Sequence, residues 1–538
     1  MSTKMPTWLE KAIFYQIYPQ SYYDSNGDGI GDIPGIIQKL NYIQSLGVTA
    51  IWLNPCFESP FQDAGYDVSN YYQVALRYGS NADLEHLFSE ARQRGLRVIL
   101  DLVPGHTSLK HPWFQQSQKA ERNPYSDWYI WNDSVWSGSE SDLPVTRGYA
   151  QRDAGYITNF FYFQPALNYG FAHPDPEKPW QQGVSAPGPK AVRQEIKNIM
   201  AFWLDKGANG FRVDMANSLV KGDPGKVATA RFWSEIRKWL DKTYPEAVLI
   251  SEWGLPAQAL PAGFHVDMLL GGWTNPGITS LFRKRGIGTH RDPYGWSFFD
   301  ESGHGDIRQF VDEYEYLYKG TKDLGFIGLI TGNHDDHPRI ADGRSMKLMK
   351  LIYLFLMTMP GTPFIYYGDE IGMTYIQDLP SKEGGYVRTG VRTPMQWTKG
   401  VNAGFSTASA KKLYLPINSN KAQINVASQE SDPDSLLNRV RQLIALRQAY
   451  PALGASGSFK VAYAQSGKPF FAYCRFHEAQ SFVVFLNPNG QSIEIGLQKN
   501  KLGENYKIIF NDRGSMESHG DTWLLKMEPV SGMIFEIL

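Results

Sequence analysis

Eight short apolar segments, each bounded by turn residues, recur through the first 370 residues of the chain. They span 13–19, 48–55, 97–104, 210–215, 247–253, 264–270, 326–335 and 362–370. Most are separated by stretches such as 81–95 and 190–207, where apolar residues recur at i, i+3 and i+4 with charges on the other face. Eight nearly continuously apolar strands that alternate with helices predict an α/β fold, a parallel (β/α)8 TIM barrel.

Two parts of the chain depart from this alternation. Roughly a hundred residues, rich in Trp, Tyr, Asn, Asp, Pro and Gly, separate the third and fourth apolar segments. From about residue 455, alternating short apolar runs are separated by turn signals such as NPNG, which is typical of antiparallel sheets. We therefore predict a catalytic barrel at 1–104 and 186–454, an inserted domain after the third strand at 105–185, and a C-terminal antiparallel β-sandwich domain at 455–538.

Charge and cysteine content restrict the partners and the compartment. The net charge is −1 and no block of like charges occurs, which argues against nucleic acid or an anionic membrane as a partner. The two cysteines lie far apart and form no disulfide framework, and the N-terminus lacks an apolar leader segment. We expect a cytoplasmic protein, or a periplasmic one if a native leader was removed, and either a monomer or a homodimer.

Charged side chains stand at the ends of several predicted strands, where a barrel of this kind binds its substrate. They are Asp101, His106, Arg212, Asp214, Glu252, His334 and Asp335. Several carboxylates with His and Arg donors, but without a Cys/His cluster or a phosphate-binding loop, favour acid/base chemistry on a neutral substrate without an organic cofactor. Glycoside hydrolysis requires such a set, because one carboxylate attacks the sugar while a second protonates the leaving oxygen.

Arg212 and Asp214 are two residues apart on one predicted strand, so their side chains point to the same side. A neighbouring guanidinium favours the charged form of a carboxyl group. We therefore expect Arg212 to keep Asp214 ionised, as a nucleophile must be.

The segment DSNGDGIGD at 24–32 has the ligand spacing of a calcium-binding EF-hand loop. Position 12 of such a loop is a glutamate, whereas this chain has Gly35, so a calcium sensor is excluded. A structural Ca²⁺ or Mg²⁺ site remains the prediction, and a glycine-rich turn without metal is the alternative. The proposed ligands are Asp24, Asn26, Asp28, the Ile30 carbonyl and Asp32.

The segments DLVPGH (101–106), GFRVD (210–214), SE (251–252) and NHD (333–335) resemble, in order and spacing, four signature regions of the α-amylase superfamily, family 13 of the glycoside hydrolases. QPALN (164–168), TPFIYYGDE (362–370) and RTPMQW (392–397) extend the resemblance over essentially the whole chain. The resemblance implies a retaining mechanism with Asp214 as nucleophile, Glu252 as general acid/base and Asp335 as transition-state stabiliser. It places Asp101, His106, Arg212 and His334 around the reacting sugar.

The sequence is most similar to the α-glucosidase and oligo-1,6-glucosidase branch of this family. In that branch an aspartate after the second strand and an arginine before RTPMQW close the pocket around the non-reducing glucose; here the matching residues are taken as Asp67 and Arg388. Tyr66 would be the stacking platform under that glucose. The resemblance thus implies an exo-acting α-glucosidase that hydrolyses, and in part transglucosylates, short α-glucosides.

Among the positions that depart from the family pattern, two concern Gly105 and Arg339. Gly105 stands where many amylases have an asparagine that ligates a second calcium, so we expect that second site to be absent. One extra residue precedes Arg339 in NHDDHPR, which leaves the role of this arginine open.

Other functions use the same barrel. A glucosyltransferase or isomerase of the sucrose or trehalose type would use the same residues and differ in how the pocket excludes water. A non-catalytic subunit, as found among relatives that have lost their carboxylates, is disfavoured because all three carboxylates are present. The choice between α-1,4 and α-1,6 linkages and the natural substrate stay open.

Overall fold

The computed structural model describes residues 5–137, 143–271, 274–282, 296–336 and 338–538; residue 337 of the NHDDHPR motif and residues 1–4 lie outside this range. Eight parallel strands close into a barrel in the order β1-β12-β11-β10-β9-β8-β5-β2. The strands are β1 (Phe14–Ile17), β2 (Ala50–Leu53), β5 (Arg97–Leu102), β8 (Gly210–Val213), β9 (Val248–Ser251), β10 (Val266–Met268), β11 (Phe326–Ile330) and β12 (Thr362–Tyr366). Each lies within one of the eight apolar segments, which confirms the predicted barrel.

The barrel strands are apolar on both faces because each face packs against protein. Phe14 on β1 points inward and stacks on Phe364 of β12, with ring centroids 4.7 Å apart, in a cluster that includes Trp52 and Ile99. Tyr15 and its neighbours on the other face belong to the larger core under the surrounding helices. This two-sided burial explains the nearly continuous apolar runs.

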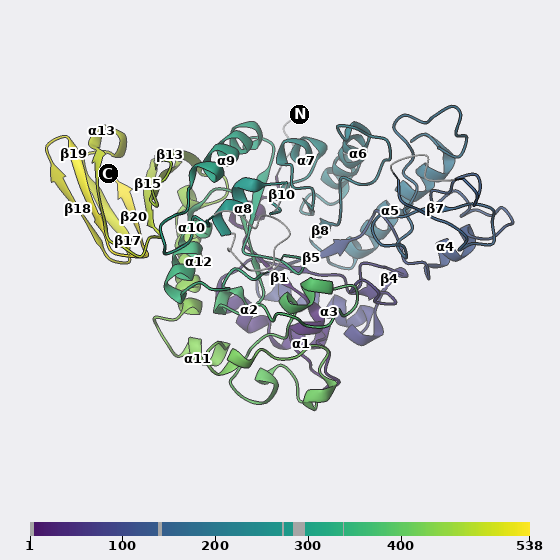
Figure 1. The fold of residues 1–538 in the computed structure, drawn as a ribbon, viewed down its shortest axis with the longest axis horizontal. Coiled ribbons are helices and arrows are strands. Elements are labelled where there is room, and N and C mark those ends of the chain that lie inside the picture. The colour runs from purple at the N-terminus through teal and green to yellow at the C-terminus, as the bar shows by residue number, and fades with distance from the viewer. Residues whose placement is uncertain (1–4, 138–142, 272–273, 283–295, 337) are drawn as a thin grey trace.

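Helices surround the barrel (Figure 1). They are α1 (Ile33–Gln38), α2 (Leu40–Leu46), α3 (Asn81–Gln93), α5 (Pro187–Asp205), α6 (Val227–Thr243), α7 (Pro256–Ala262), α8 (Pro276–Phe282), α9 (Arg308–Thr321), α10 (Met346–Thr358), α11 (Val426–Glu430) and α12 (Leu436–Ala449). Local signals set several ends: a capping box between Ser80 and Asp83 begins α3, and left-handed Gly47 follows α2.

The inserted segment and the C-terminal part lie at opposite ends of the molecule in Figure 1. The segment between β5 and α5 carries α4 (Pro112–Ser117) and the short pair β6 (Val145–Thr146) and β7 (Tyr156–Ile157). A second short pair, β3 (Phe57–Glu58) and β4 (Asn70–Val74), follows β2. The inserted segment and the β3–β4 pair follow the carboxyl ends of barrel strands. They therefore lie on that side of the barrel and can form walls above a substrate.

The C-terminal part consists of two antiparallel sheets. One has the order β13-β14-β15-β20-β17 and the other β16-β19-β18. Their bounds are β13 (Ser458–Ala464), β14 (Phe471–His477), β15 (Gln480–Asn487), β16 (Ile493–Gln498), β17 (Tyr506–Asn511), β18 (Gly514–His519), β19 (Thr522–Met527) and β20 (Ser531–Ile537), with the short helix α13 (Lys499–Leu502) after β16. Side chains of both sheets share one apolar cluster, including Phe485 and Leu525, as predicted for an antiparallel domain.

Within the described ranges, no helix combines the length and the apolar character needed to cross a bilayer.

Candidate active site

Four charged side chains from three neighbouring strands meet at the carboxyl end of the barrel. Asp101 on β5 and Arg212 on β8 are register partners, and Asp214 and Glu252 directly follow β8 and β9. Arg212 Nη1 donates to Asp101 Oδ1 at 2.8 Å and to Asp214 Oδ1 at 3.1 Å, while its Nη2 lies 2.8 Å from Glu252 Oε1. One guanidinium is therefore shared by three carboxylates.

Burial raises the pKa of two carboxyl groups in this cluster. Burial raises the pKa of Asp101 to about 6, although Arg212 opposes the shift. Burial and the negative charge of Glu252 also raise the pKa of Asp214, again against Arg212. Arg212 lowers the pKa of Asp214, in the direction predicted, but it is shared with Asp101 and Glu252, and burial together with the charge of Glu252 opposes it.

Asp335, which follows β11, has the opposite electrostatics. Its Oδ1 accepts from Arg388 Nη1 at 2.6 Å and from Arg392 Nη2 at 3.0 Å. Burial lowers the pKa of the adjacent His334 to about 3, so this ring is neutral at pH 7. Burial alone would raise the pKa of Asp335, but the positive groups around it hold the pKa well below its ordinary value. Asp335 is therefore ionised at pH 7, whereas the pKa values of Asp101 and Asp214 are shifted upward.

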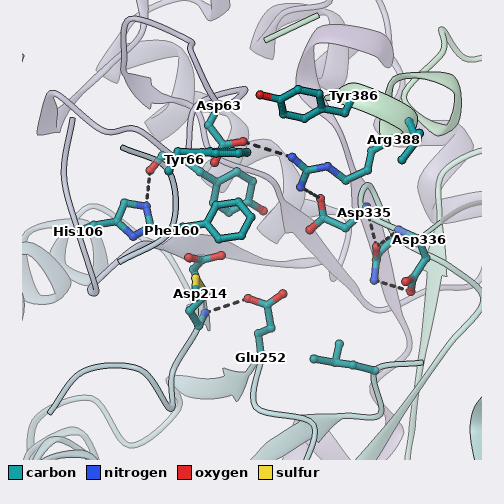
Figure 2. A pocket seen from close by; sticks show the side chains of 15 residues that line it. Asp63, Tyr66, His106, Phe160, Asp214, Glu252, Asp335, Asp336, Tyr386 and Arg388 are labelled. Atoms are coloured by element: carbon teal, nitrogen blue, oxygen red, sulfur yellow. Dashed lines mark hydrogen bonds and ion pairs between the residues drawn. The ribbon is translucent and has the colours of Figure 1, made fainter. Parts of the chain in front are cut away.

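These side chains line a cavity of about 500 Å³, a size suited to a small organic ligand. Figure 2 shows Asp214 and Glu252 on one side and Asp335 with Arg388 across from them. The exposed ring of Phe160, from the inserted segment, projects into the same space.

Of the predicted sugar-binding residues, Tyr66, His106 and Arg388 line the cavity. Asp101, Arg212 and His334 lie beneath this lining and are buried. Asp101 accepts a hydrogen bond from the Tyr66 hydroxyl at 3.1 Å, and the His334 ring stacks on the Tyr66 ring with centroids 5.2 Å apart. The structure thus brings these six side chains to one place, three at the surface of the cavity and three as its support.

Asp67 is the exception, and its predicted position in the cavity wall is wrong. Its carboxylate accepts from the Ser59 hydroxyl at 2.8 Å and from the N–H groups of Gln62 and Asp63 at 3.0 Å each, so it closes its own loop. Asp63, four residues earlier, lines the cavity, and its Oδ1 lies 3.6 Å from Arg388 Nη2. The acid that faces Arg388 is therefore Asp63.

Two arginines near the site have roles that the sequence did not assign. Arg392, the first residue of RTPMQW, contacts Asp335 and donates to the His334 carbonyl at 2.8 Å. Arg339 is buried away from the cavity lining, where it pairs with Asp369 at 3.0 Å and donates to the carbonyl oxygens of Tyr367 and Val391. Arg339 therefore holds the loops after β12 together.

The loop at 24–32 is closed by its own side chains. The carboxylate of Asp24 accepts from the N–H groups of Asn26, Gly27 and Gly29 and from the Ser406 hydroxyl. Among the described residues, no three His, Cys, Asp or Glu side chains gather as a metal-binding group. The donor set is nevertheless oxygen only, as Ca²⁺ and Mg²⁺ prefer, and within the described residues Asp28 accepts one hydrogen bond, from the Ile30 N–H to Oδ1 at 2.8 Å.

Comparisons with known proteins agree with this geometry. The family described as "Alpha amylase, catalytic domain" matches residues 16–264 and 278–456. An oligo-1,6-glucosidase of Parageobacillus thermoglucosidasius is 34% identical, with 82% of this chain and 84% of the relative covered. A glucan 1,6-alpha-glucosidase of Streptococcus dysgalactiae subsp. equisimilis is 31% identical, with 90% and 92% covered.

Two solved structures resemble the whole chain, each at 26% identity. One is an alpha-glucosyl transfer enzyme with a TM-score of 0.80, covering 99% of this chain and 100% of its own. The other is an isomaltulose synthase mutant of Erwinia rhapontici in complex with sucrose, with a TM-score of 0.78 and 99% of both chains covered.

Proposed function

Because the chain belongs to the α-amylase family of glycoside hydrolases, we propose that it is a retaining, exo-acting α-glucosidase that removes single glucose units from the non-reducing end of short α-glucosides. The observation that carries this proposal is the approach of Asp63 and Arg388 across one end of the cavity, next to Asp335. The carboxyl group and the guanidinium at that end offer hydrogen bonds to the terminal hydroxyls of a sugar, and their contact closes that end of the cavity.

The carboxylates divide the chemistry between them. Glu252 donates its proton to the glycosidic oxygen as the bond from this oxygen to the anomeric carbon breaks, and the Asp214 carboxylate forms a bond to the same carbon. Glu252, now ionised, then takes a proton from a water molecule whose oxygen attacks the anomeric carbon and releases Asp214. Two inversions at one carbon retain the α configuration.

The neighbouring groups support both steps. The Met215 N–H donates to Glu252 Oε2 at 2.8 Å and orients this carboxyl group. Asp335 remains ionised and stabilises the positive charge that develops on the sugar ring, an electrostatic contribution that a buried, preorganised group makes strongly. Tyr66, held by Asp101 and His334, offers its ring to the apolar face of the glucose.

The names of the relatives favour α-1,6 linkages. Both of the curated relatives described above are named for cleavage of 1,6-linked glucosides. We therefore propose isomaltose and short isomaltooligosaccharides as the preferred substrates.

A glucosyl transfer or sucrose isomerisation activity is the second candidate, because the two solved structures have such functions in their names. It would use the same glucosyl-enzyme and differ only in whether water or a sugar hydroxyl attacks it.

The test is a product profile of the purified chain on isomaltose, maltose, sucrose and p-nitrophenyl α-glucoside. Glucose as the main product supports hydrolysis, whereas a new disaccharide as the main product supports transfer. The variant Asp214→Asn should lose at least about 10³-fold in kcat, as expected when a nucleophile is removed. Release of glucose from none of these substrates would refute the proposed function.

We also propose that Asp24, Asn26, Asp28, the Ile30 carbonyl and Asp32 hold a structural Ca²⁺ or Mg²⁺. The alternating acidic and amide oxygens support this proposal, with Asp24 shared between the cation and the Ser406 hydroxyl. Such a cation would stabilise the loop that leads from β1 into α1 and would take no part in the reaction.

A further inference from the structure

Asn159 lies at a junction between the inserted segment and the floor of the active site. It lies just after β7, separated from it by Thr158, and its backbone N–H donates to the Gln164 carbonyl at 3.0 Å. Its half-buried side chain reaches two separate elements: Nδ2 lies 3.2 Å from both His106 Nδ1, after β5, and Ser218 Oγ, after β8. The Lys221 ammonium donates to Asn159 Oδ1 at 2.9 Å.

Lys221 determines which way the amide faces. An ammonium group only donates hydrogen bonds, so the atom opposite Lys221 must be the amide oxygen. The NH₂ group then faces His106, and His106 Nδ1 must accept. Lys221 is itself held by a bond of 2.7 Å to the Ser218 carbonyl.

The orientation of the amide in turn fixes the tautomer of His106. With Nδ1 as acceptor, the imidazole proton lies on Nε2, which is 3.1 Å from the Tyr66 carbonyl oxygen. Figure 2 shows this bond between His106 and Tyr66 at one side of the cavity. Burial lowers the pKa of His106 to about 3, so the neutral ring is the form present at pH 7. His106 therefore supports the loop that carries the Tyr66 ring.

The chain makes room for this amide at Gly105. A β-carbon at position 105 would lie 2.6 Å from Asn159 Nδ2, closer than side chains tolerate. Any larger residue there would displace the amide. Gly105 is thus matched to Asn159, which gives a structural reason for the departure from the family pattern at this position.

The Asn159 amide nitrogen also contacts residues next to Glu252. Its Nδ2 lies 3.8 Å from the Met215 sulfur as well as near Ser218. Met215 has a left-handed backbone with a φ of 41°, an unusual conformation for this residue type, and its N–H donates to Glu252 Oε2. One side chain therefore contacts both the support of Tyr66 and the turn that orients Glu252.

We propose that Asn159 is a positioning residue for the active site, which holds His106 in the Nε2–H tautomer and steadies the turn at Met215. The inference rests on the proposed α-glucosidase function only for its kinetic consequence. Asn159 touches no reacting atom, so its effect is transmitted through Tyr66 and Glu252.

The sharpest variant is Asn159→Asp. It keeps the size and the acceptor for Lys221 but presents an oxygen instead of an NH₂ group to His106 Nδ1. The ring must then carry a proton on Nδ1. We expect an unchanged or higher Tm, because an aspartate pairs with Lys221, but a loss of about tenfold or more in kcat/KM for p-nitrophenyl α-glucoside, the effect of one misdirected buried hydrogen bond.

The matched control is Asn132→Ala in the same inserted segment, where Asn132 accepts from the Gly155 N–H and does not line the cavity. This variant should lower Tm and leave kcat/KM within about twofold, since a lost hydrogen bond away from the site affects stability only. If Asn159→Asp keeps kcat/KM within the same twofold range, or loses activity only in proportion to Tm, the proposal is overturned.

A second readout is independent of activity. In ¹⁵N NMR of histidine-labelled protein, with His106 assigned from the missing signal of His106→Asn, the wild type should carry the ring proton on Nε2 and Asn159→Asp should carry one on Nδ1. A wild-type proton on Nδ1 would overturn the proposal. If the wild type released no nitrophenol, the proposed function would fail, and the tautomer would still decide the role of Asn159.

Discussion

Asp63 and Asp67 show how two similar residues in one short loop separate into different roles. Asp67 has its oxygens occupied by the hydroxyl and N–H groups of its own loop, whereas Asp63 faces the cavity and Arg388. Between them, Ala64 and Gly65 have left-handed backbone conformations, with φ of 52° and 100°, which turn the chain sharply. The shape of this turn therefore decides which of the two aspartates faces the cavity, and their positions in the sequence do not reveal it.

The first prediction concerns this pair. Asp63→Ala should raise the KM for p-nitrophenyl α-glucoside by about tenfold or more, because a hydrogen bond between a sugar hydroxyl and the buried Asp63 carboxyl group is lost. Asp67→Asn should lower Tm instead, because its NH₂ group would face backbone N–H donors. Steady-state kinetics and thermal melts of both variants check this, and a KM effect confined to Asp67→Asn would contradict it.

The positions of the proposed catalytic residues could be predicted from the sequence because they stand at strand ends, where a parallel barrel directs them to one face. Asp214, Glu252 and Asp335 all lie there. Their charge states could not be predicted in the same way. Arg212 contacts three carboxylates rather than one. Asp335 forms ion pairs with Arg388 and Arg392, which lie in the segment after β12, over fifty residues further along the chain.

At the scale of single elements, the turn after β12 buries a carboxyl group against two tyrosine hydroxyls. Glu370, in the short helical turn Asp369–Ile371, accepts hydrogen bonds from the hydroxyls of Tyr15 and Tyr42 at Oε1, and its Oε2 has no hydrogen-bond partner among the described residues. Burial raises the pKa of Glu370 from 4.5 to about 7, against the two hydroxyl bonds. The folded chain therefore binds a proton here that the unfolded chain releases above about pH 4.5.

The second prediction follows from this difference. Since the folded state binds more protons between pH 4.5 and 7, the contribution of Glu370 to stability is complete below pH 4.5 and falls by up to about 3 kcal/mol as the pH rises to 7. Glu370→Gln carries no titratable proton, so its Tm should rise relative to wild type between pH 5 and pH 8. Thermal melts across this range check the sign, and a constant Tm difference would speak against it.

The third prediction concerns the loop at 24–32. If it binds a cation, EDTA should lower the Tm of the wild type while the activity of the chain that stays folded persists, because the catalytic residues lie at other strand ends. Asp28→Ala removes one ligand and leaves the hydrogen bonds of Asp24 in place, so its Tm should respond less to EDTA. Identical melts with and without EDTA would exclude a structural cation under those conditions.

The whole molecule combines a barrel predicted by hydrophobic periodicity with cavity walls that periodicity alone does not predict. The barrel follows from two-sided burial of its strands, which leaves a strong local pattern. The cavity walls come from the inserted segment and the loops after β2 and β12, whose short strands and turns carry little periodicity. Tyr66, Phe160 and Arg388 come from three such segments, and only the closed fold brings them to the same cavity.

The retaining, exo-acting cleavage of α-glucosides is tested most directly by ¹H NMR of the first products from reduced isomaltotriose, isomaltotriitol, in which the two ends differ. The geometry predicts α-glucose and isomaltitol as the initial products, with β-glucose appearing only by mutarotation, and no such signals with Asp214→Asn. Initial β-glucose would contradict the roles given to Asp214 and Glu252, and initial release of isomaltose with glucitol would contradict closure of the cavity by Asp63 and Arg388.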